Sequence, residues 1–205
     1  MGKALIIKGA NFASVAVGKE TVEPKVYIEL AGTGAAADFG VGDYYISNAE
    51  YGKIYHKTEN GYEAANIEPG TILKYQDYYF EFKGNDQQPR FTPYEFNLED
   101  VTDFTNGAVW KLSNGEVSLD NSSTYNQSAY MSIQLSDGDT LVYNTRGGNS
   151  FNGLIIDKGS GNIEVADSRN SGYDIMIHTA EGNETAYINT LTSYLTNGAF
   201  VCKAK

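Results

Sequence analysis

The segment from Glu116 to Gly148, EVSLDNSSTYNQSAYMSIQLSDGDTLVYNTRGG, carries the clearest fold signal in the chain. Across residues 130–135, Tyr, Ser and Gln alternate with Met, Ile and Leu, which is the two-residue period of a half-buried strand. The alternation returns at Leu141 and Tyr143 after a Ser-Asp-Gly-Asp turn, and this predicts a hairpin with one apolar face. Such a face must be covered, so we expect a second sheet over it, as in a β-sandwich.

The rest of the C-terminal half repeats this strand-and-turn pattern. Short apolar runs bounded by Gly, Asn or Asp occur at residues 108–112, 116–119, 153–157, 162–166, 173–178, 185–191 and 198–203. Together with the first segment they make about nine strands spaced by roughly ten residues, which is typical of a sandwich or jelly roll. The final run is apolar, so we expect the C-terminal residues to be tied into a sheet.

The N-terminal half contains a region rich in Tyr between residues 43 and 83. Short strands are predicted at residues 44–46, 53–56, 61–64, 72–75 and 78–82, separated by Asn-Gly, Pro-Gly and Gln-Asp turns. They would form a small, flat meander whose Tyr rings serve either in core and intersubunit packing or in stacking against carbohydrate. A further strand is predicted at VYIEL, residues 26–30, with Val26, Ile28 and Leu30 on one face.

Three regions follow from these patterns. Residues 1–24 are too short to own a core, and they form either a first strand paired with the body or an extended N-terminal arm that orders against a partner. Residues 25–100 hold the Tyr-rich small β region and a connector, and residues 101–205 hold the sandwich or jelly roll. The predicted fold class is therefore all-β, with a small Tyr-rich meander followed by a β-sandwich or jelly roll and preceded by an extended arm.

Charge and composition exclude several classes of partner. The formal net charge is -11, and residues 1–30 hold four Lys and three Glu, so the acidic excess lies in the remainder. An acidic body argues against a nucleic-acid partner, which rewards clustered Lys and Arg. No apolar run approaches the roughly 20 residues that span a bilayer. No secretory signal is recognised at the start, and we expect no membrane partner and a protein that is made and retained in a cytoplasm.

Motifs that carry reaction chemistry are scarce. His56 and His178 lack metal-ligand spacing and are expected on sheet faces. Asp137, Asp139 and Asp157 lack the spacing of a calcium loop and are interpreted as turn residues. Neither a nucleophile elbow nor a phosphate loop opening a helix is recognised. We therefore predict a non-enzymatic protein with no catalytic residues, no metal ligands and no cofactor.

Surface aromatic residues are the remaining candidates for function. Trp110, Tyr125, Tyr130 and Arg146 lie close in sequence around the segment described first. If they are exposed on a sandwich face or loop end, their rings and the guanidinium would suit sugar stacking and hydrogen bonding. If they are buried, they are simply core, and this second interpretation is favoured for Trp110 and also for Tyr143.

Three stretches resemble parts of a known group of proteins. KALIIKGANFASVAVG at residues 3–18 resembles the start of virion appendage proteins from phages and prophages of gut Bacteroidales, including crAss-like phages. The Tyr-rich run at residues 52–84 is similar to short strands of phage fibre and receptor-binding proteins. WKLSNGEVSLDNSSTYNQSAYMSIQLSDGDTLVYNT at residues 110–145 resembles a jelly-roll module of phage fibres and of bacterial surface or carbohydrate-active proteins. That module's "SxxY...DYIPVxPGDTIxY" pattern is matched at Ser123, Tyr125, Tyr130, Gly138, Asp139, Thr140 and Tyr143, whereas Asp137 stands at its usual Pro.

The resemblance implies a structural component of a bacteriophage virion, a head fibre or a tail-associated fibre subunit, with no catalytic residues to carry over. It implies a homo-oligomer that is assembled in the host cytoplasm, located in the virion, and bound to capsid or tail proteins through residues 1–24. A host-surface glycan is a further expected contact. Two alternatives stay open, namely a carbohydrate-binding module of a host-surface receptor or glycan-degrading system, and a glycan-cleaving depolymerase with acids contributed across subunits.

Overall fold

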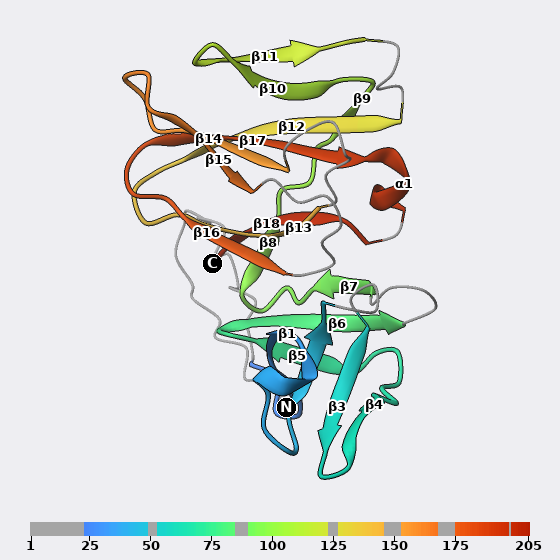
Figure 1. Cartoon of the computed structure of the whole chain (residues 1–205). Helices are drawn as coiled ribbons and strands as arrows, with labels where there is room; N and C mark the ends of the chain where they lie inside the picture. Colours follow the sequence, from blue (N-terminus) through green and yellow to red (C-terminus); the bar gives the residue numbers. More distant parts are fainter. Residues whose placement is uncertain are drawn as a thin grey trace, which may run out of the picture.

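The computed structural model describes residues 23–48, 53–84, 90–122, 127–145, 153–167, 175–196 and 198–205. These residues form four stacked layers of β-structure, seen edge-on in Figure 1. From the N-terminal side they are a seven-stranded sheet A, a four-stranded sheet B, a five-stranded sheet C and a two-stranded hairpin. The predicted arm, residues 1–24, lies outside the described residues except for Glu23 and Pro24.

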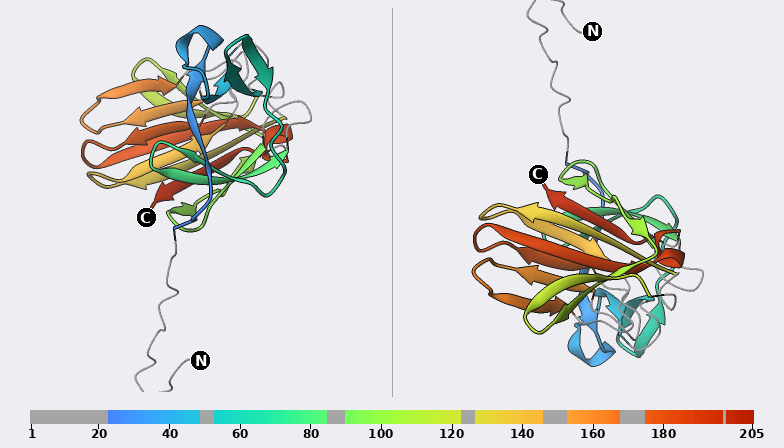
Figure 2. Two further views of the ribbon diagram at one scale, coloured as in Figure 1. Left: turned by 90° about the horizontal axis from the view of Figure 1, so that it is seen from below. Right: turned by 90° about the horizontal axis from the view of Figure 1, so that it is seen from above.

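Sheet A contains the Tyr-rich region and has the strand order β4-β3-β2-β1-β5-β6-β7. Its strands are β1 (Ile28–Gly34), β2 (Tyr44–Ser47), β3 (Ile54–Thr58), β4 (Gly61–Ala64), β5 (Ile72–Tyr75), β6 (Tyr78–Gly84) and β7 (Arg90–Pro93). A short 3-10 helix, η1 (Ala36–Asp38), follows β1. β2–β4 and β5–β7 are two antiparallel meanders, and β1 lies between them, parallel to both β2 and β5. The left view in Figure 2 shows β1 running across the direction of the sandwich strands.

The predicted strand at residues 26–30 is correct in part. Ile28 and Leu30 face the core, but Val26 lies before the strand with 84% of its surface exposed. The pairing of β1 with β5 begins only at Ile28 opposite Leu73, so Val26 has no neighbouring strand to cover it.

Sheets B and C form the sandwich, and all of their pairings are antiparallel. Sheet B has the order β16-β13-β18-β8, and sheet C has the order β15-β14-β17-β12-β9. Their strands are β8 (Leu98–Asp100), β9 (Thr105–Asn106), β12 (Ser128–Leu135), β13 (Thr140–Asn144), β14 (Leu154–Asp157), β15 (Ile163–Asp167), β16 (Met176–Thr179), β17 (Glu184–Leu191) and β18 (Phe200–Ala204). With β9 set aside, the two four-stranded orders β8-β18-β13-β16 and β12-β17-β14-β15 are those of a jelly roll. The predicted all-β fold class is confirmed.

The predicted hairpin between residues 130 and 143 is wrong. β12 pairs with β17 and β9, whereas β13 pairs with β16 and β18, so the turn between β12 and β13 crosses from sheet C to sheet B. Asp139 closes this turn, because its Oδ2 accepts the Ser136 N–H at 2.9 Å. The alternation was nevertheless informative, since Met131 and Leu141 reach the same core from opposite sheets.

The outermost layer is the hairpin of β10 (Val109–Ser113) and β11 (Glu116–Asp120), whose strands match the runs predicted at residues 108–112 and 116–119. Asn114 and Gly115 have φ values of 53° and 79°, as a two-residue hairpin turn of type I′ requires. The hairpin lies over β12 and β17 on the outer face of sheet C (Figure 1). The one α-helical turn among the described residues is α1 (Thr192–Leu195), directly after β17.

Two hydrophobic cores separate the three sheets. The first lies between sheets A and B and includes Phe80 and Phe91 together with Phe200. The second lies between sheets B and C. Strand β18 serves both, because Phe200 and Cys202 belong to the first core and Val201 to the second. The central strands of sheet B, β13 and β18, are therefore covered on both faces, and the Tyr-rich sheet and the jelly roll share one continuous interior.

Candidate functional site

An aromatic cluster, formed by Trp110, Tyr130 and Tyr187, lies on the outer face of sheet C. The Trp110 ring centroid is 5.6 Å from that of Tyr130 and 4.7 Å from that of Tyr187, with interplanar angles of 88° and 64°. The rings come from β10, β12 and β17, and the strand period explains their direction. Their neighbours Met131 and Ile188 point into the second core, so Tyr130 and Tyr187 must point away from it.

Three hydrogen bonds hold Trp110 in this cluster. The Trp110 N–H donates to Asn189 Oδ1 at 2.7 Å, and Asn189 Nδ2 donates to the Trp110 carbonyl at 2.9 Å. The indole Nε1–H donates to the Met131 carbonyl at 2.9 Å. Asn189 is fully buried, so its amide pins the hairpin to sheet C. The indole N–H is thereby used inside the protein, so a ligand at Trp110 would contact only the surface of its ring.

Polar side chains continue the row along β12 beside the cluster. Ser132 is exposed and lies opposite Tyr187, and Gln134 Oε1 accepts the Thr185 hydroxyl at 3.1 Å. Half-buried rings next to hydroxyl and amide groups can contact the C–H face of a sugar and hydrogen-bond its edge. The described side chains of this arrangement include no paired acid and base.

The structure brings together two of the four residues predicted for ligand binding. Trp110 and Tyr130 are in contact, whereas Tyr125 and Arg146 lie outside the described residues. Tyr143, the other candidate for burial, is 2% exposed in the second core. Sequence reasoning missed Tyr187, although the alternation in TAYINTL places it on the same face as Asn189.

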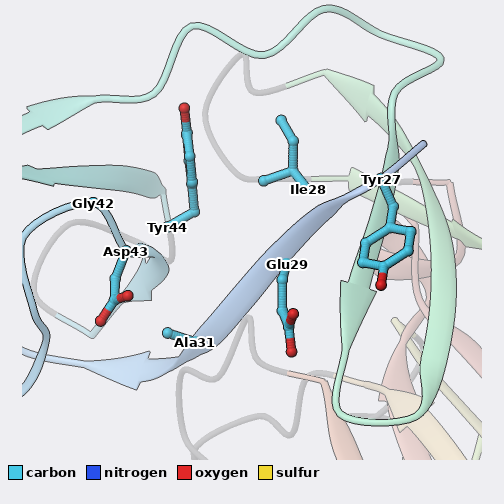
Figure 3. Close-up of a pocket in the computed structure, with 7 residues that line it drawn as sticks. All are labelled: Tyr27, Ile28, Glu29, Ala31, Gly42, Asp43 and Tyr44. Carbon is cyan, nitrogen blue, oxygen red and sulfur yellow. The ribbon is translucent and has the colours of Figure 1, made fainter.

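A hollow in sheet A, which we call the β1–β2 cleft, was not predicted. It encloses about 530 Å³ and is lined by Tyr27, Ile28, Glu29, Ala31, Gly42, Asp43 and Tyr44 (Figure 3). The β1–β2 ladder begins only at Leu30 opposite Tyr44, so the two chain segments separate before that pair. The segment leading into β2 is held by Asp43, whose Oδ2 accepts the Gly40 N–H at 2.8 Å. The sequence carries no signal for this parallel pairing, and the cleft is a product of it.

Aromatic and charged groups surround the cleft. The Tyr27 ring packs edge-on against Tyr79 at 5.5 Å, and Lys74 Nζ lies 5.5 Å from the Tyr27 centroid. The Tyr79 hydroxyl donates to Glu23, and this hydrogen bond, reinforced by burial, raises the pKa of Tyr79 to about 12. On the other side of β1, Tyr44 stacks on His56 at 4.6 Å.

Glu184, at one end of the sandwich, is a buried carboxylate with an ionisable partner. Its side chain is 1% exposed and lies 2.7 Å from His178 Nε2, while its Oε1 accepts the Glu181 N–H. Burial acts to raise the pKa of Glu184, but the hydrogen bonds from His178 and Glu181 outweigh it, so the pKa is lowered. Both oxygens of the Glu184 carboxylate therefore have partners within the protein, which is typical of an ion pair that stabilises the end of a strand.

The remaining acidic candidates serve turns. Asp139 accepts from Ser136 and from Lys203 Nζ at 2.7 Å, and these bonds lower the pKa of Asp139. Asp157 Oδ1 accepts the Gly159 N–H at 2.8 Å. Among the described residues, no group of three His, Cys, Asp or Glu side chains is placed to hold a metal ion. The described part of the chain also contains no helix of the length and apolarity needed to cross a membrane.

Comparison with known proteins adds no relative. No protein-family model, no curated protein and no solved structure matches the chain.

Proposed function

We propose that the chain is a structural subunit of a bacteriophage virion, a head fibre or tail-associated fibre component, and not an enzyme. In this proposal residues 1–24 bind the capsid or tail, and the β-rich body projects from the particle. The resemblance of residues 3–18, 52–84 and 110–145 to phage appendage proteins motivates it. The observation that carries it is the combination of a jelly roll with a layer of Tyr-rich sheet on the same interior, which suits a rigid projecting body.

The charge distribution supports separate roles for the N-terminal segment, which attaches, and the β-rich body, which projects. Residues 1–30 are nearly neutral, with four Lys and three Glu, whereas the whole chain has a net charge of -11. An acidic body repels other copies of itself at a distance and stays dispersed, while a segment without that excess can approach an acidic or neutral particle surface.

Deletion of residues 1–24 tests the attachment. Phage particles made with the truncated chain should lack it, while the purified truncated chain keeps the thermal transition and far-UV circular dichroism of the full chain. Normal incorporation of the truncated chain would overturn the proposal.

The proposed subunit is homo-oligomeric through its β-structure. Light scattering on the full chain and on a chain beginning at Lys25 should give the same discrete oligomer. If both chains were monomeric, the result would contradict the fibre proposal and favour a stand-alone binding module.

The aromatic cluster favours a second candidate, a carbohydrate-binding module. Its rings are half-buried and bordered by hydroxyl and amide groups, and three hydrogen bonds hold the residue at its centre, Trp110. A glycan array should then show defined signals that Tyr130→Ala abolishes and that Tyr62→Ala, a change of an exposed ring in sheet A, leaves intact. An array without signals for the unchanged protein would eliminate this candidate.

A further inference from the structure

The β1–β2 cleft has free hydrogen-bond acceptors. Glu29 is exposed, and no described residue forms a hydrogen bond or ion pair with its carboxylate. Asp43 uses Oδ2 for the Gly40 N–H, and within the described part of the chain its Oδ1 has no partner. In Figure 3 the Glu29 and Asp43 side chains both extend to the same side of β1, with Ala31 between them. A ligand in the cleft would therefore meet two carboxylate acceptors on one side.

The cleft also offers apolar surface of suitable shape. Tyr27 is 38% exposed, and its ring is held upright by the edge contact with Tyr79. Ala31 supplies further carbon surface on the side of β1 that carries Tyr27 and Glu29, whereas Ile28 and Tyr44 line the cleft from the side of the first core (Figure 3). Gly42 has no side chain and leaves its side of the cleft open. A volume of about 530 Å³ lies in the range of small-ligand sites.

The charges around the cleft select the class of ligand. Two carboxylates disfavour an anion. A cation is disfavoured as well, because Lys74 already lies opposite Glu29 across the β1–β5 pair and 5.5 Å from the Tyr27 centroid. A pyranose without charge fits both features, since its hydroxyl groups donate to carboxylates and its C–H face packs on a ring.

We infer that the β1–β2 cleft is a binding site for a neutral saccharide, with Glu29 and Asp43 accepting its hydroxyl hydrogens and Tyr27 packing against its ring. This site goes beyond the proposed function, because neither virion attachment through residues 1–24 nor the aromatic cluster uses it. It places ligand recognition in sheet A, on the opposite side of the layered body from the hairpin.

Saturation-transfer difference NMR on the full chain tests the site. The probes are the methyl glycosides of glucose, galactose, mannose and N-acetylglucosamine, with glucosamine and glucuronate as the cationic and anionic comparators. At least one neutral glycoside should give a saturable signal, with ring protons of one sugar face most affected. Glu29→Gln should raise the dissociation constant of that glycoside by about tenfold or more, because a hydrogen bond to a charged acceptor is replaced by a weaker one.

Matched variants separate the cleft from other surfaces and from misfolding. Tyr27→Ala should weaken binding as Glu29→Gln does. Tyr62→Ala in β4 and Glu59→Gln in the turn between β3 and β4 change the same residue types away from the cleft and should leave binding unchanged. All four variants are compared for their thermal transition. The inference is overturned if only glucosamine or glucuronate binds, if no probe binds, or if Tyr130→Ala removes the binding while Glu29→Gln does not. The attachment test on particles is unaffected by any of these results.

Discussion

Sheet A and the jelly roll differ in how the faces of their sheets are buried. Sheet A has a parallel strand at its centre and packs one face on sheet B, while Tyr27, Glu29 and Lys74 line its other face. The jelly roll is antiparallel throughout and its inner sheet, sheet B, is covered twice. Burial on both faces is often associated with parallel sheets, but here the position of a sheet in the stack decides it.

This difference appears directly in the strand sequences. In β12, which has one face on the core, Ser132 and Gln134 are exposed between more buried side chains, whereas the last four residues of β13 are all buried. The shared first core means that sheet A and the jelly roll should lose their structure together, and the following changes test how far this holds.

The largest effect is expected from Phe80→Ala in the first core. Phe80 is fully buried and its ring lies 5.6 Å from that of Phe200 in sheet B. Loss of the ring should cost about 3–5 kcal/mol of unfolding free energy. Trp110, the single Trp of the chain, reports on the jelly roll by fluorescence, and circular dichroism reports on all strands. Both transitions should shift together, and a shifted dichroism transition with unchanged Trp110 fluorescence would show that the two regions unfold separately.

A smaller effect is expected from Asn189→Ala, which loosens the outermost layer only. The change leaves the Trp110 N–H and carbonyl without their amide partner, at a cost of about 1–3 kcal/mol. Hydrogen exchange should accelerate across β10 and β11 and stay unchanged in sheet A. Thr185→Ala, which removes one exposed hydrogen bond on the same strand, is the control and should change stability by about 0.5 kcal/mol or less.

Lowering the pH should weaken the jelly roll through Glu184. Its pKa in the folded protein lies below the ordinary value of 4.5. Its contribution to stability is therefore present above that ordinary value and is lost as the pH falls through the lower folded value. Urea unfolding at pH 7 and pH 3 should show a smaller loss for Glu184→Gln than for the unchanged protein. An equal loss would contradict the role of the His178 pair, and Glu164→Gln, at an exposed ion pair, serves as the control.

The smallest perturbation is chemical labelling of Cys202, which tests whether sheets A and B separate. Burial between the sheets, with a further contribution from Asp100, raises the pKa of the Cys202 thiol to about 12. At pH 8 the thiolate population is then about a thousandfold below that of an ordinary thiol. Iodoacetamide should leave the folded protein unlabelled and react fully in urea. Rapid labelling without urea would show that the first core opens.

Local sequence patterns predicted the strands well where turns are marked. The predicted strands at residues 61–64 and 72–75 coincide with β4 and β5, because Asn-Gly and Pro-Gly turns fix their ends. Pairing was the weak point. The alternation in β12 indicates which of its side chains face a core, but it does not indicate which strand pairs with β12. The predicted partner, β13, belongs to the other sheet.

In the candidate sites, too, local patterns could be predicted and strand pairing could not. Trp110 and Tyr130 could be identified because they are close in sequence to one strong strand pattern. Tyr187 reaches them through the β12–β17 pairing, and the β1–β2 cleft depends on where two parallel strands begin to separate. Both features depend on which strands pair and where that pairing begins, which a single sequence does not reveal.

The middle position of β18 has a consequence for the speed of folding. β18 completes sheet B between β13 and β8, and Thr102 bonds to Val201 across a separation of 99 residues. Contacts of such range require the closure of long loops before they stabilise the chain, and domains dominated by them fold in milliseconds to seconds. Until β18 arrives, the edges of β8 and β13 are open to other chains. Chaperones that shield those edges during synthesis should therefore raise the yield of folded protein more than any stabilising change on the surface of sheet A.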